Sequence, residues 1–359
     1  MKKIEVRRLS KYVPLTREQF RGRFFERFYD PAFDAVKAEL DKVCAIAWDG
    51  YIEYRKSPRS RPAGAGFANE RFKLPVEWLA ARDAIRIAER KQRNPKSRSR
   101  VLVVSGATRS EHTCPGEASK TRRLANHVVA TLRRVRGFET DLLDLSALAD
   151  EPWKVIHPCK TCVSTAMPLC HWPCSCYPNH AMGQTNDWMS EIYPRWAAAH
   201  GVYIVAPVNW YQVSSSLKLM MDRLVCADGG NPDPTTTRGK DPKLAKQLEL
   251  KGWDYPKHLA GRAFAVVAHG DAEGPENVRD MLRAWLTTLG MHQAGAQAAV
   301  GTYIGYYEPY ATSHQSLDAD RDLFTEVANA AKSLAHMIGQ IRSGEFRPSD
   351  AGLRNPRQK

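Results

Sequence analysis

The most conspicuous chemical feature of the sequence is a cluster of five cysteines between residues 159 and 176, spaced Cys-x2-Cys-x7-Cys-x3-Cys-x-Cys. Four thiolates can hold an iron–sulfur cluster or a zinc ion, and His171 or His180 could replace one of them. A buried Cys-rich loop without metal is the third interpretation. The candidate metal ligands are Cys159, Cys162, Cys174 and Cys176.

A short loop rich in hydroxyl groups follows the apolar run 101–104 and precedes a helical pattern. A strand, a small polar loop and a helix N-terminus together suit a phosphate, because free backbone N–H groups and the helix dipole face the anion. The loop has neither a Gly-Lys-Ser/Thr nor a G-x-G-x-x-G motif, which favours a mononucleotide over a dinucleotide. An ordinary strand-to-helix turn is the alternative. The predicted phosphate contacts are Thr108, Arg109, Ser110, Ser119 and Thr121.

Two later loops supply candidates for binding a flat ring. Aromatic residues at the end of the run 202–206 could flank a heterocycle, or could simply pack. His269 follows another apolar run and could donate to a ligand or cap the strand, while Gly270 allows close backbone approach. The predicted ring contacts are Pro207, Val208, Asn209, Trp210, Tyr211, His269 and Gly270.

From residue 101 onward, apolar runs alternate with helical patterns. The strands are expected at 101–105, 138–144, 202–206, 262–268 and 296–303, and the helices at 117–136, 186–199, 214–226, 275–289 and 318–342. This alternation predicts a parallel sheet with helices on both faces. Ligands of such sheets bind at the carboxyl ends of the strands. Residues 227–260 are predicted to form a long loop that serves as a lid or oligomer arm.

The first hundred residues carry most of the net charge of +14, with 25 of the 53 basic residues and 13 of the 39 acidic residues. Helices are expected at 16–30, 32–47 and 76–90, with a linker at 91–100. Charges of both signs are interspersed without a nucleic-acid-binding motif, so a solvated surface or an oligomer contact is expected. No apolar run is long enough to span a membrane and no secretory signal is visible, so a cytoplasmic protein is expected.

These motifs resemble the NADPH-dependent FMN reductases and multimeric flavodoxins, a family that includes iron–sulfur flavoproteins. Residues 106–109 resemble the family's G-S-x-R and residues 119–121 its later S/N-x-T. Residues 207–210 resemble P-V-Y-W, and residues 217–223 match L-K-x-x-x-D-R. The resemblance implies a flavodoxin-like α/β three-layer sandwich, with a five-stranded parallel sheet and a helical N-terminal extension. The expected divisions are a basic extension (1–98), an FMN-binding domain (99–343) and a tail (344–359).

Some positions depart from the family pattern. Ala107 replaces a Ser and removes one hydroxyl from the phosphate loop, and Asn209 replaces the usual Tyr or Glu beside the flavin. An insertion at 111–118 adds Glu111 and Glu117, whose carboxylates must point away from a phosphate. The cysteine spacing is also wider than the Cys-x2-Cys-x2-Cys of the iron–sulfur relatives.

The resemblance implies an FMN-dependent NAD(P)H oxidoreductase that passes hydride or electrons to a quinone or another electron-deficient aromatic acceptor. The cofactor supplies the chemistry, so no catalytic side chain is predicted. A homodimer or homotetramer is implied, with no nucleic-acid or membrane partner. The alternative is an iron–sulfur flavoprotein that carries electrons to a protein partner.

Overall fold

The computed structural model describes residues 4–8, 10–53, 59–179, 186–349 and 351–353. Its centre is a parallel sheet with the order β4 (Phe138–Asp144), β3 (Ser99–Ser105), β5 (Gly201–Asn209) and β7 (Ala263–Gly270). The strands β8 (His292–Gln293) and β9 (Ala299–Tyr303) both pair with β7, and the short β6 (Gln212–Val213) pairs antiparallel with β5. This strand order confirms the predicted flavodoxin-like fold.

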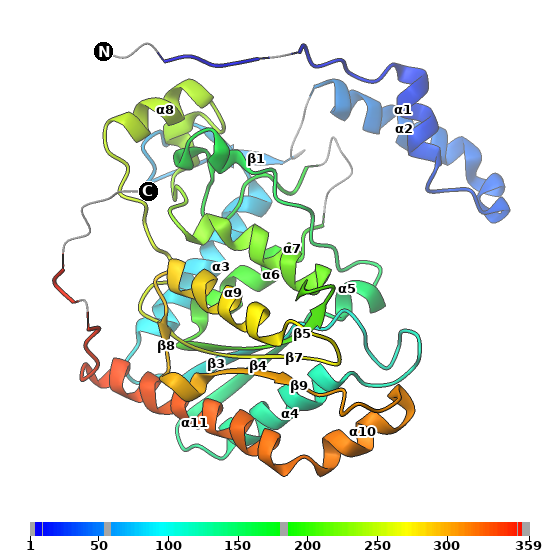
Figure 1. Ribbon diagram of the computed structural model, residues 1–359. Helices are drawn as coiled ribbons and strands as arrows, with labels where there is room; N and C mark the ends of the chain where they lie inside the picture. Colours follow the sequence, from blue (N-terminus) through cyan, green and yellow to red (C-terminus); the bar gives the residue numbers. More distant parts are fainter. Residues whose placement is uncertain (1–3, 9, 54–58, 180–185, 350, 354–359) are drawn as a thin grey trace.

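Helices cover both faces of the sheet (Figure 1). On one face lie α4 (Lys120–Arg133) and α11 (Arg321–Ser343), and on the other lie α6 (Met189–Ala198), α7 (Ser215–Arg223) and α9 (Pro275–Thr288). Within β3, Val101 and Val103 face the first layer, whereas Leu102 and Val104 face the second. All four side chains are fully buried, which explains why the run is continuously apolar.

Two segments differ from the sequence prediction. Residues 227–260 are not a structureless loop, because they contain α8 (Pro242–Leu250), whose N-cap Asp241 accepts hydrogen bonds from the backbone of Lys243 and Leu244. The helix predicted at 318–342 is present as α11, but α10 (Tyr310–Ala319), which precedes it, was not predicted. Asp320 separates them by capping α11, where its carboxylate accepts from the Leu323 N–H at 3.0 Å.

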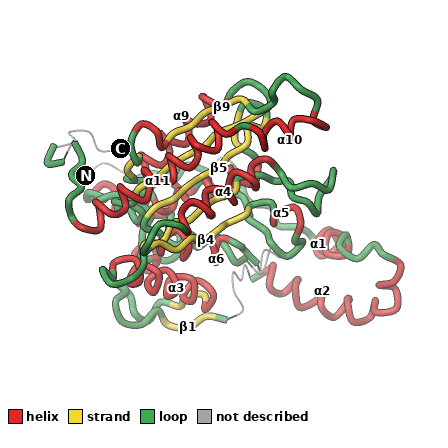
Figure 2. Tube along the Cα trace, turned by 90° about the horizontal axis from the view of Figure 1, so that it is seen from below, coloured by secondary structure: helices red, strands yellow, loops and turns green. Residues whose placement is uncertain are grey.

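The N-terminal helices α1 (Arg17–Phe25) and α2 (Lys37–Ile52) form a hairpin that extends away from the body (Figures 1 and 2). A 3-10 turn at Pro31–Val36 joins them. The hairpin is held by aromatic packing, with the ring of Phe20 5.1 Å from that of Tyr51. Only Cys44 and Tyr51 are buried in these two helices, so the hairpin has almost no core of its own.

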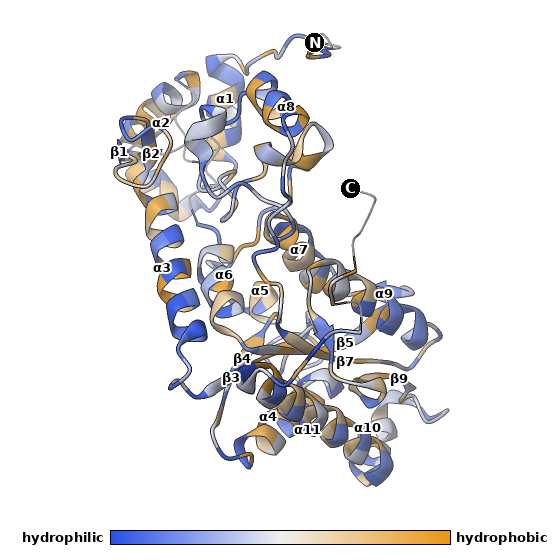
Figure 3. Cartoon of the chain, turned by 90° about the vertical axis from the view of Figure 1, so that its left-hand side faces the viewer, coloured by the Kyte–Doolittle hydropathy of each residue, from blue (hydrophilic) through white to orange (hydrophobic). Residues whose placement is uncertain are grey.

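The next part of the extension is joined to the body. A small hairpin of β1 (Ser60–Pro62) and β2 (Lys73–Pro75) leads into α3 (Val76–Arg93), which runs beside α6 (Figure 3). Ile85 and Ala88 of α3 belong to the same core as the sheet, and the Trp78 indole donates to the Pro173 carbonyl at 3.0 Å. The short α5 (Ala147–Asp150) follows β4. No helix among the described residues is both long and apolar enough to cross a membrane.

Candidate active site

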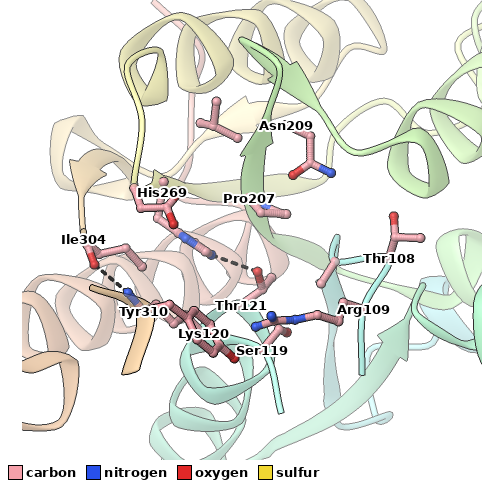
Figure 4. A pocket seen from close by; sticks show the side chains of 14 residues that line it. Thr108, Arg109, Ser119, Lys120, Thr121, Pro207, Asn209, His269, Ile304 and Tyr310 are labelled. Atoms are coloured by element: carbon pink, nitrogen blue, oxygen red, sulfur yellow. Dashed lines mark hydrogen bonds between the residues drawn. The ribbon is translucent and has the colours of Figure 1, made fainter. Parts of the chain in front are cut away.

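A cavity of about 360 Å³ opens at the carboxyl edge of the sheet. The chain leaves β3 toward α4 on one face and leaves β5 toward α7 on the other, so the cavity lies at the switch point of the sheet. It is lined by the loop after β3, the start of α4, the last residues of β5 and β7, and residues that follow β7 and β9 (Figure 4). The predicted residues that line it are Thr108, Arg109, Ser119, Thr121, Pro207, Val208, Asn209, His269 and Gly270.

One end of the cavity is cationic. Ser119 caps α4 by accepting from the Arg122 N–H at 3.1 Å, so the positive end of the helix faces the cavity. Lys120 lies in the first turn, where its ammonium donates to the Ile304 carbonyl at 2.7 Å (Figure 4). Burial lowers the pKa of Lys120. Arg109 adds a second cation, and its guanidinium lies 5.2 Å from the centre of the Tyr310 ring. This end is suited to a phosphate.

A neutral imidazole lies between the cationic end and the strand ends. Nε2 of His269 is 3.0 Å from Oγ1 of Thr121, and both residues line the cavity (Figure 4). Burial, aided by the nearby Lys120 charge, lowers the pKa of His269 to about 3. His269 therefore provides a hydrogen-bonding group without a charge near neutral pH.

The other wall is built where the ends of β3, β5 and β7 come close together. A Cβ on Gly106 would lie 3.1 Å from the Val205 carbonyl oxygen, and a Cβ on Gly270 would lie 3.0 Å from Cβ of Val208. Ser214 caps α7 and its hydroxyl also donates to the Gly106 carbonyl. These contacts place the apolar Pro207 and Val208 against the cavity, as a flat ring requires.

Three predicted contacts do not line this cavity. The hydroxyl of Ser110 donates to Asp150 and accepts from the His112 N–H, so it is engaged away from the cavity. Trp210 and Tyr211 point outward, with 94% and 60% of their surface exposed. Ser110 was predicted from its hydroxyl group, and the other two residues from their aromatic rings. The sequence shows neither the hydrogen-bond partners of Ser110 nor the outward turn of the backbone at residues 210–211.

Lys120 and Tyr310 also line the cavity, although neither is among the predicted phosphate and ring contacts. The carboxylate of Glu117, which was expected to point away from a phosphate, accepts a hydrogen bond from the Tyr310 hydroxyl at 2.8 Å. Tyr310 therefore links the inserted loop to the start of α10. Lys120 could have been predicted to line the cavity because it directly follows the cap residue Ser119. The first turn of a phosphate-binding helix faces the anion.

Residues 99–305 match the model of the NADPH-dependent FMN reductase family. The chain belongs to this family. Its solved neighbours include RosB with bound 8-demethyl-8-formylriboflavin-5'-phosphate, at 15% identity, TM-score 0.46, and coverage of 69% of this chain and 82% of that chain. An oxidoreductase from Corynebacterium diphtheriae matches at 15% identity and TM-score 0.38, covering 68% and 99%. The apo form of the NADH:FMN oxidoreductase EMOB matches at 16% and 0.37, covering 72% and 97%. No curated protein matches the sequence significantly.

The cavity of this FMN reductase family member fits FMN on its own geometry. Its volume lies within the roughly 300–1,000 Å³ of small-molecule sites. Arg109, Lys120 and the N-terminus of α4 suit the phosphate, and Pro207 and Val208 suit the face of the ring. The close approach at Gly270 leaves no room for a side chain against Val208, which also lines the cavity.

The cysteines form a separate centre in this family member. Sγ of Cys162 lies 3.8 Å from Sγ of Cys176, and the Lys240 ammonium donates to Cys176 at 2.6 Å. Hydrogen bonds from Cys162 and Cys174, with the charge of Lys240, hold the pKa of Cys176 far below its usual range. The thiol of Cys159 instead accepts from the Thr161 N–H at 3.4 Å.

A metal ion is not indicated by this arrangement. No group of three or more His, Cys, Asp or Glu side chains in the described ranges is placed to hold one. His171 is engaged by Ser175 at 2.5 Å and by Thr237 at 3.1 Å, and His180 lies outside the described residues. The predicted ligand set Cys159, Cys162, Cys174 and Cys176 stays a prediction.

The L-K-x-x-x-D-R segment has a structural role at its last position. Arg223 is fully buried and pairs with Asp187, the closest atoms being Nη2 and Oδ2 at 2.5 Å. Nη1 of Arg223 donates to the His157 carbonyl at 2.9 Å. Arg223 therefore fastens the start of the cysteine-rich segment to α7, rather than contacting the cavity.

Proposed function

We propose that the protein is an FMN-dependent NAD(P)H oxidoreductase that reduces a quinone or another electron-deficient aromatic acceptor. The observation that carries the proposal is the cavity at the switch point, with a cationic end and an apolar wall, inside the region that matches the FMN reductase family. Bound FMN would supply the hydride and electron transfer chemistry.

The residues of this chain would act by binding and orientation. Arg109, Lys120 and the N-terminus of α4 would hold the phosphate, and Pro207 with Val208 would support one face of the ring. The uncharged His269 would keep Thr121 in place without adding charge beside the ring. No side chain needs to accept or donate a proton in this scheme, because the redox chemistry belongs to the cofactor.

The first test is the absorption spectrum of the protein purified without oxygen, before and after addition of NADPH and, separately, NADH. We expect flavin bands near roughly 375 and 450 nm that bleach with the preferred nucleotide. Menadione should then restore the bands. A protein that is colourless and takes up no added FMN would disprove the proposal.

The cellular setting and assembly belong to the same proposal. We infer a homodimer or homotetramer, which the family resemblance implies, and a cytoplasmic location. Sedimentation of the FMN-loaded protein would measure the oligomeric state, and a monomer at micromolar concentration would contradict it.

The iron–sulfur electron carrier is the competing function. It would require about four iron atoms per chain and a broad brown absorption that NADPH alone does not bleach. Metal analysis of the same anaerobic preparation decides between the two, because the oxidoreductase proposal needs flavin and no iron.

A further inference from the structure

A second cavity, of about 630 Å³, lies directly beside the first. Its lining runs from Tyr211 after β5 through residues 271–277, at the loop after β7 and the start of α9, to Tyr303 at the end of β9. Asp271 lines both cavities, so the two adjoin at this residue. Gly274 lies against Tyr211, where an added Cβ would be 3.5 Å from the Tyr211 Cα.

The walls of this second cavity are aromatic. Tyr211, Tyr303 and Tyr307 line it, and the rings of Tyr303 and Tyr307 lie 4.9 Å apart. Tyr307 is 94% exposed, although large aromatic side chains usually gain stability from burial. The backbone of Tyr211 and Tyr307 has positive φ angles of 65° and 56°, which are unusual for bulky residues. The chain therefore presents these rings to solvent at a backbone cost.

The remaining polar lining is acidic. Asp271, Glu273 and Glu276 line the cavity, and among its described lining residues there is no Lys, Arg or His. The guanidinium of Arg279 on α9 is bound to Asp280 at 2.9 Å and also interacts electrostatically with Glu276, while Lys120 in the first cavity interacts with Asp271. An acidic cavity is notable in a chain whose net charge is +14. The charged side chains that line this cavity are thus opposite in sign to Arg109 and Lys120 at the phosphate end of the first cavity.

We propose that the second cavity is the acceptor subsite and that it binds a planar aromatic cation. This inference rests on the proposed function and specifies its acceptor. Tyrosine faces attract a cation through their ring electrons and stack against a flat ring. The carboxylates add attraction for a cation and repel a sulfonate or carboxylate on an acceptor. The shared residue Asp271 places this cavity next to the proposed FMN site.

The reaction that this subsite would serve is balanced in atoms and charge. One hydride is lost from the dihydronicotinamide of NAD(P)H as its C–H bond breaks, and one new bond to hydrogen forms on the acceptor. The acceptor cation becomes a neutral dihydro product, and the nucleotide becomes its oxidised form. Because the product has lost its charge, its attraction to Glu273 and Glu276 weakens, which favours release.

The test compares three planar acceptors: N-methylphenazinium as the cation, menadione as the neutral compound and 1,2-naphthoquinone-4-sulfonate as the anion. The FMN-loaded protein is compared with the double variant Glu273→Gln/Glu276→Gln, and uncatalysed rates are subtracted. We expect the ratio of kcat/KM for the cation to that for menadione to fall roughly tenfold in the variant. The ratio of kcat/KM for the anion to that for menadione should rise. Glu345→Gln, which removes an exposed carboxylate after α11 and outside the cavity lining, is the control and should leave both ratios unchanged.

A binding measurement tests the subsite without turnover. Fluorescence anisotropy of N-methylacridinium, a planar cation, should report binding to the FMN-loaded protein that weakens with salt. The affinity should decrease in the double variant and in Tyr307→Ala. If the double variant does not fold, Glu273→Gln alone serves, with a smaller expected change in the same direction.

The outcomes separate the two proposals. Equal responses of all three acceptors to the double variant, with N-methylacridinium binding unchanged, would overturn the subsite while menadione reduction still supports the oxidoreductase. A protein that binds no FMN and does not reduce menadione would instead defeat the proposed function, and N-methylacridinium binding would still decide whether the cavity accepts cations.

Discussion

The imidazole of His269 lies 3.0 Å from the hydroxyl of Thr121, although the two residues are 148 positions apart in the chain. His269 is at the end of β7, and Thr121 is in the first turn of α4. The contact joins the ring side of the cavity to its phosphate side across the sheet edge. A single buried hydrogen bond therefore helps to set the distance between the two parts of the proposed FMN site.

Because burial lowers the pKa of His269 to about 3, the imidazole should stay neutral through the working range of the protein. We expect the dissociation constant of FMN to show no His269-dependent inflection between about pH 5 and pH 8. Flavin fluorescence titrations of the protein and of His269→Gln measure this. An inflection near pH 6.5 that is lost in the variant would show that His269 titrates in the site.

The same depressed pKa makes the folded state sensitive to acid. The unfolded chain gains a proton on His269 below its ordinary pKa of 6.5, whereas the folded chain does so only near 3. The stability from the neutral buried imidazole is thus fully present above about pH 6.5 and is lost as the pH falls toward 3. Urea unfolding at pH about 7 and about 5 should show a smaller loss for His269→Gln than for the natural sequence. Equal losses would assign the acid sensitivity to other groups.

Arg109→Gln should weaken FMN binding while leaving the fold unchanged. Its guanidinium lines the cavity over Tyr310 and forms no buried ion pair in the described structure, so its loss removes about one charge-assisted hydrogen bond. A roughly tenfold increase in the FMN dissociation constant is expected, with an unchanged melting temperature. Ser119→Ala is the contrasting variant, because loss of the α4 cap should cost about 1 kcal/mol of unfolding free energy. Unchanged FMN affinity in Arg109→Gln would remove this residue from the phosphate site.

Gly270→Ala should disturb the ring side of the site. The new methyl would lie 3.0 Å from Cβ of Val208, so the ends of β7 and β5 would have to separate. We expect weaker FMN binding, measured by fluorescence titration. Gly22→Ala in α1 is the control, since nothing lies within 4 Å of its added Cβ and alanine favours a helix interior. If both variants bind FMN equally well, the close approach at Gly270 is not needed for the cofactor.

Asp187→Asn should strongly destabilise the protein. It removes the carboxylate partner of Arg223, whose side chain is fully buried, and leaves the guanidinium without a counter-charge. Breaking a buried pair in this way costs about 3–5 kcal/mol. The control Asp222→Asn, at the residue before Arg223 on α7, removes only the exposed ion pair with Lys218 and should cost less than about 1 kcal/mol of unfolding free energy. Chemical denaturation of the two variants makes the comparison, and equal losses would contradict a structural role for Arg223.

Much of the fold could be predicted because its strands are buried on both faces and are therefore continuously apolar, as in 101–104 and 263–268. The helix α8 was missed although Asp241 and Pro242 are a typical start signal, because the surrounding Pro and Gly residues indicated a loop. The helix α10 was not predicted because only its Ser313 and Leu317 are buried, which leaves little apolar periodicity in its sequence.

The candidate site was predicted where the signal is local and was missed where it depends on distant partners. Ser119 caps the helix that directly follows it, which the sequence shows, and Gly270 was predicted from its residue type although the residue it approaches, Val208, is on another strand. The side chain of Lys120 is positioned by its hydrogen bond to the Ile304 carbonyl, 184 residues away. The side chain of Ser110 is positioned by its hydrogen bond to Asp150 in α5. Such pairings arise only when the chain is folded, so residue type alone could not assign these side chains.

The packing of α3 against α6 has a practical consequence for recombinant work. A shortened clone that begins at residue 99, where the family match starts, would remove Ile85 and Ala88 from the core and take away the Trp78 bond to Pro173. The face of α6 that α3 covers would become an exposed apolar surface, and the shortened protein should aggregate during expression. A clone that begins near residue 60 would omit the α1–α2 hairpin yet keep that flank covered, which makes it the smaller version suited to crystallisation.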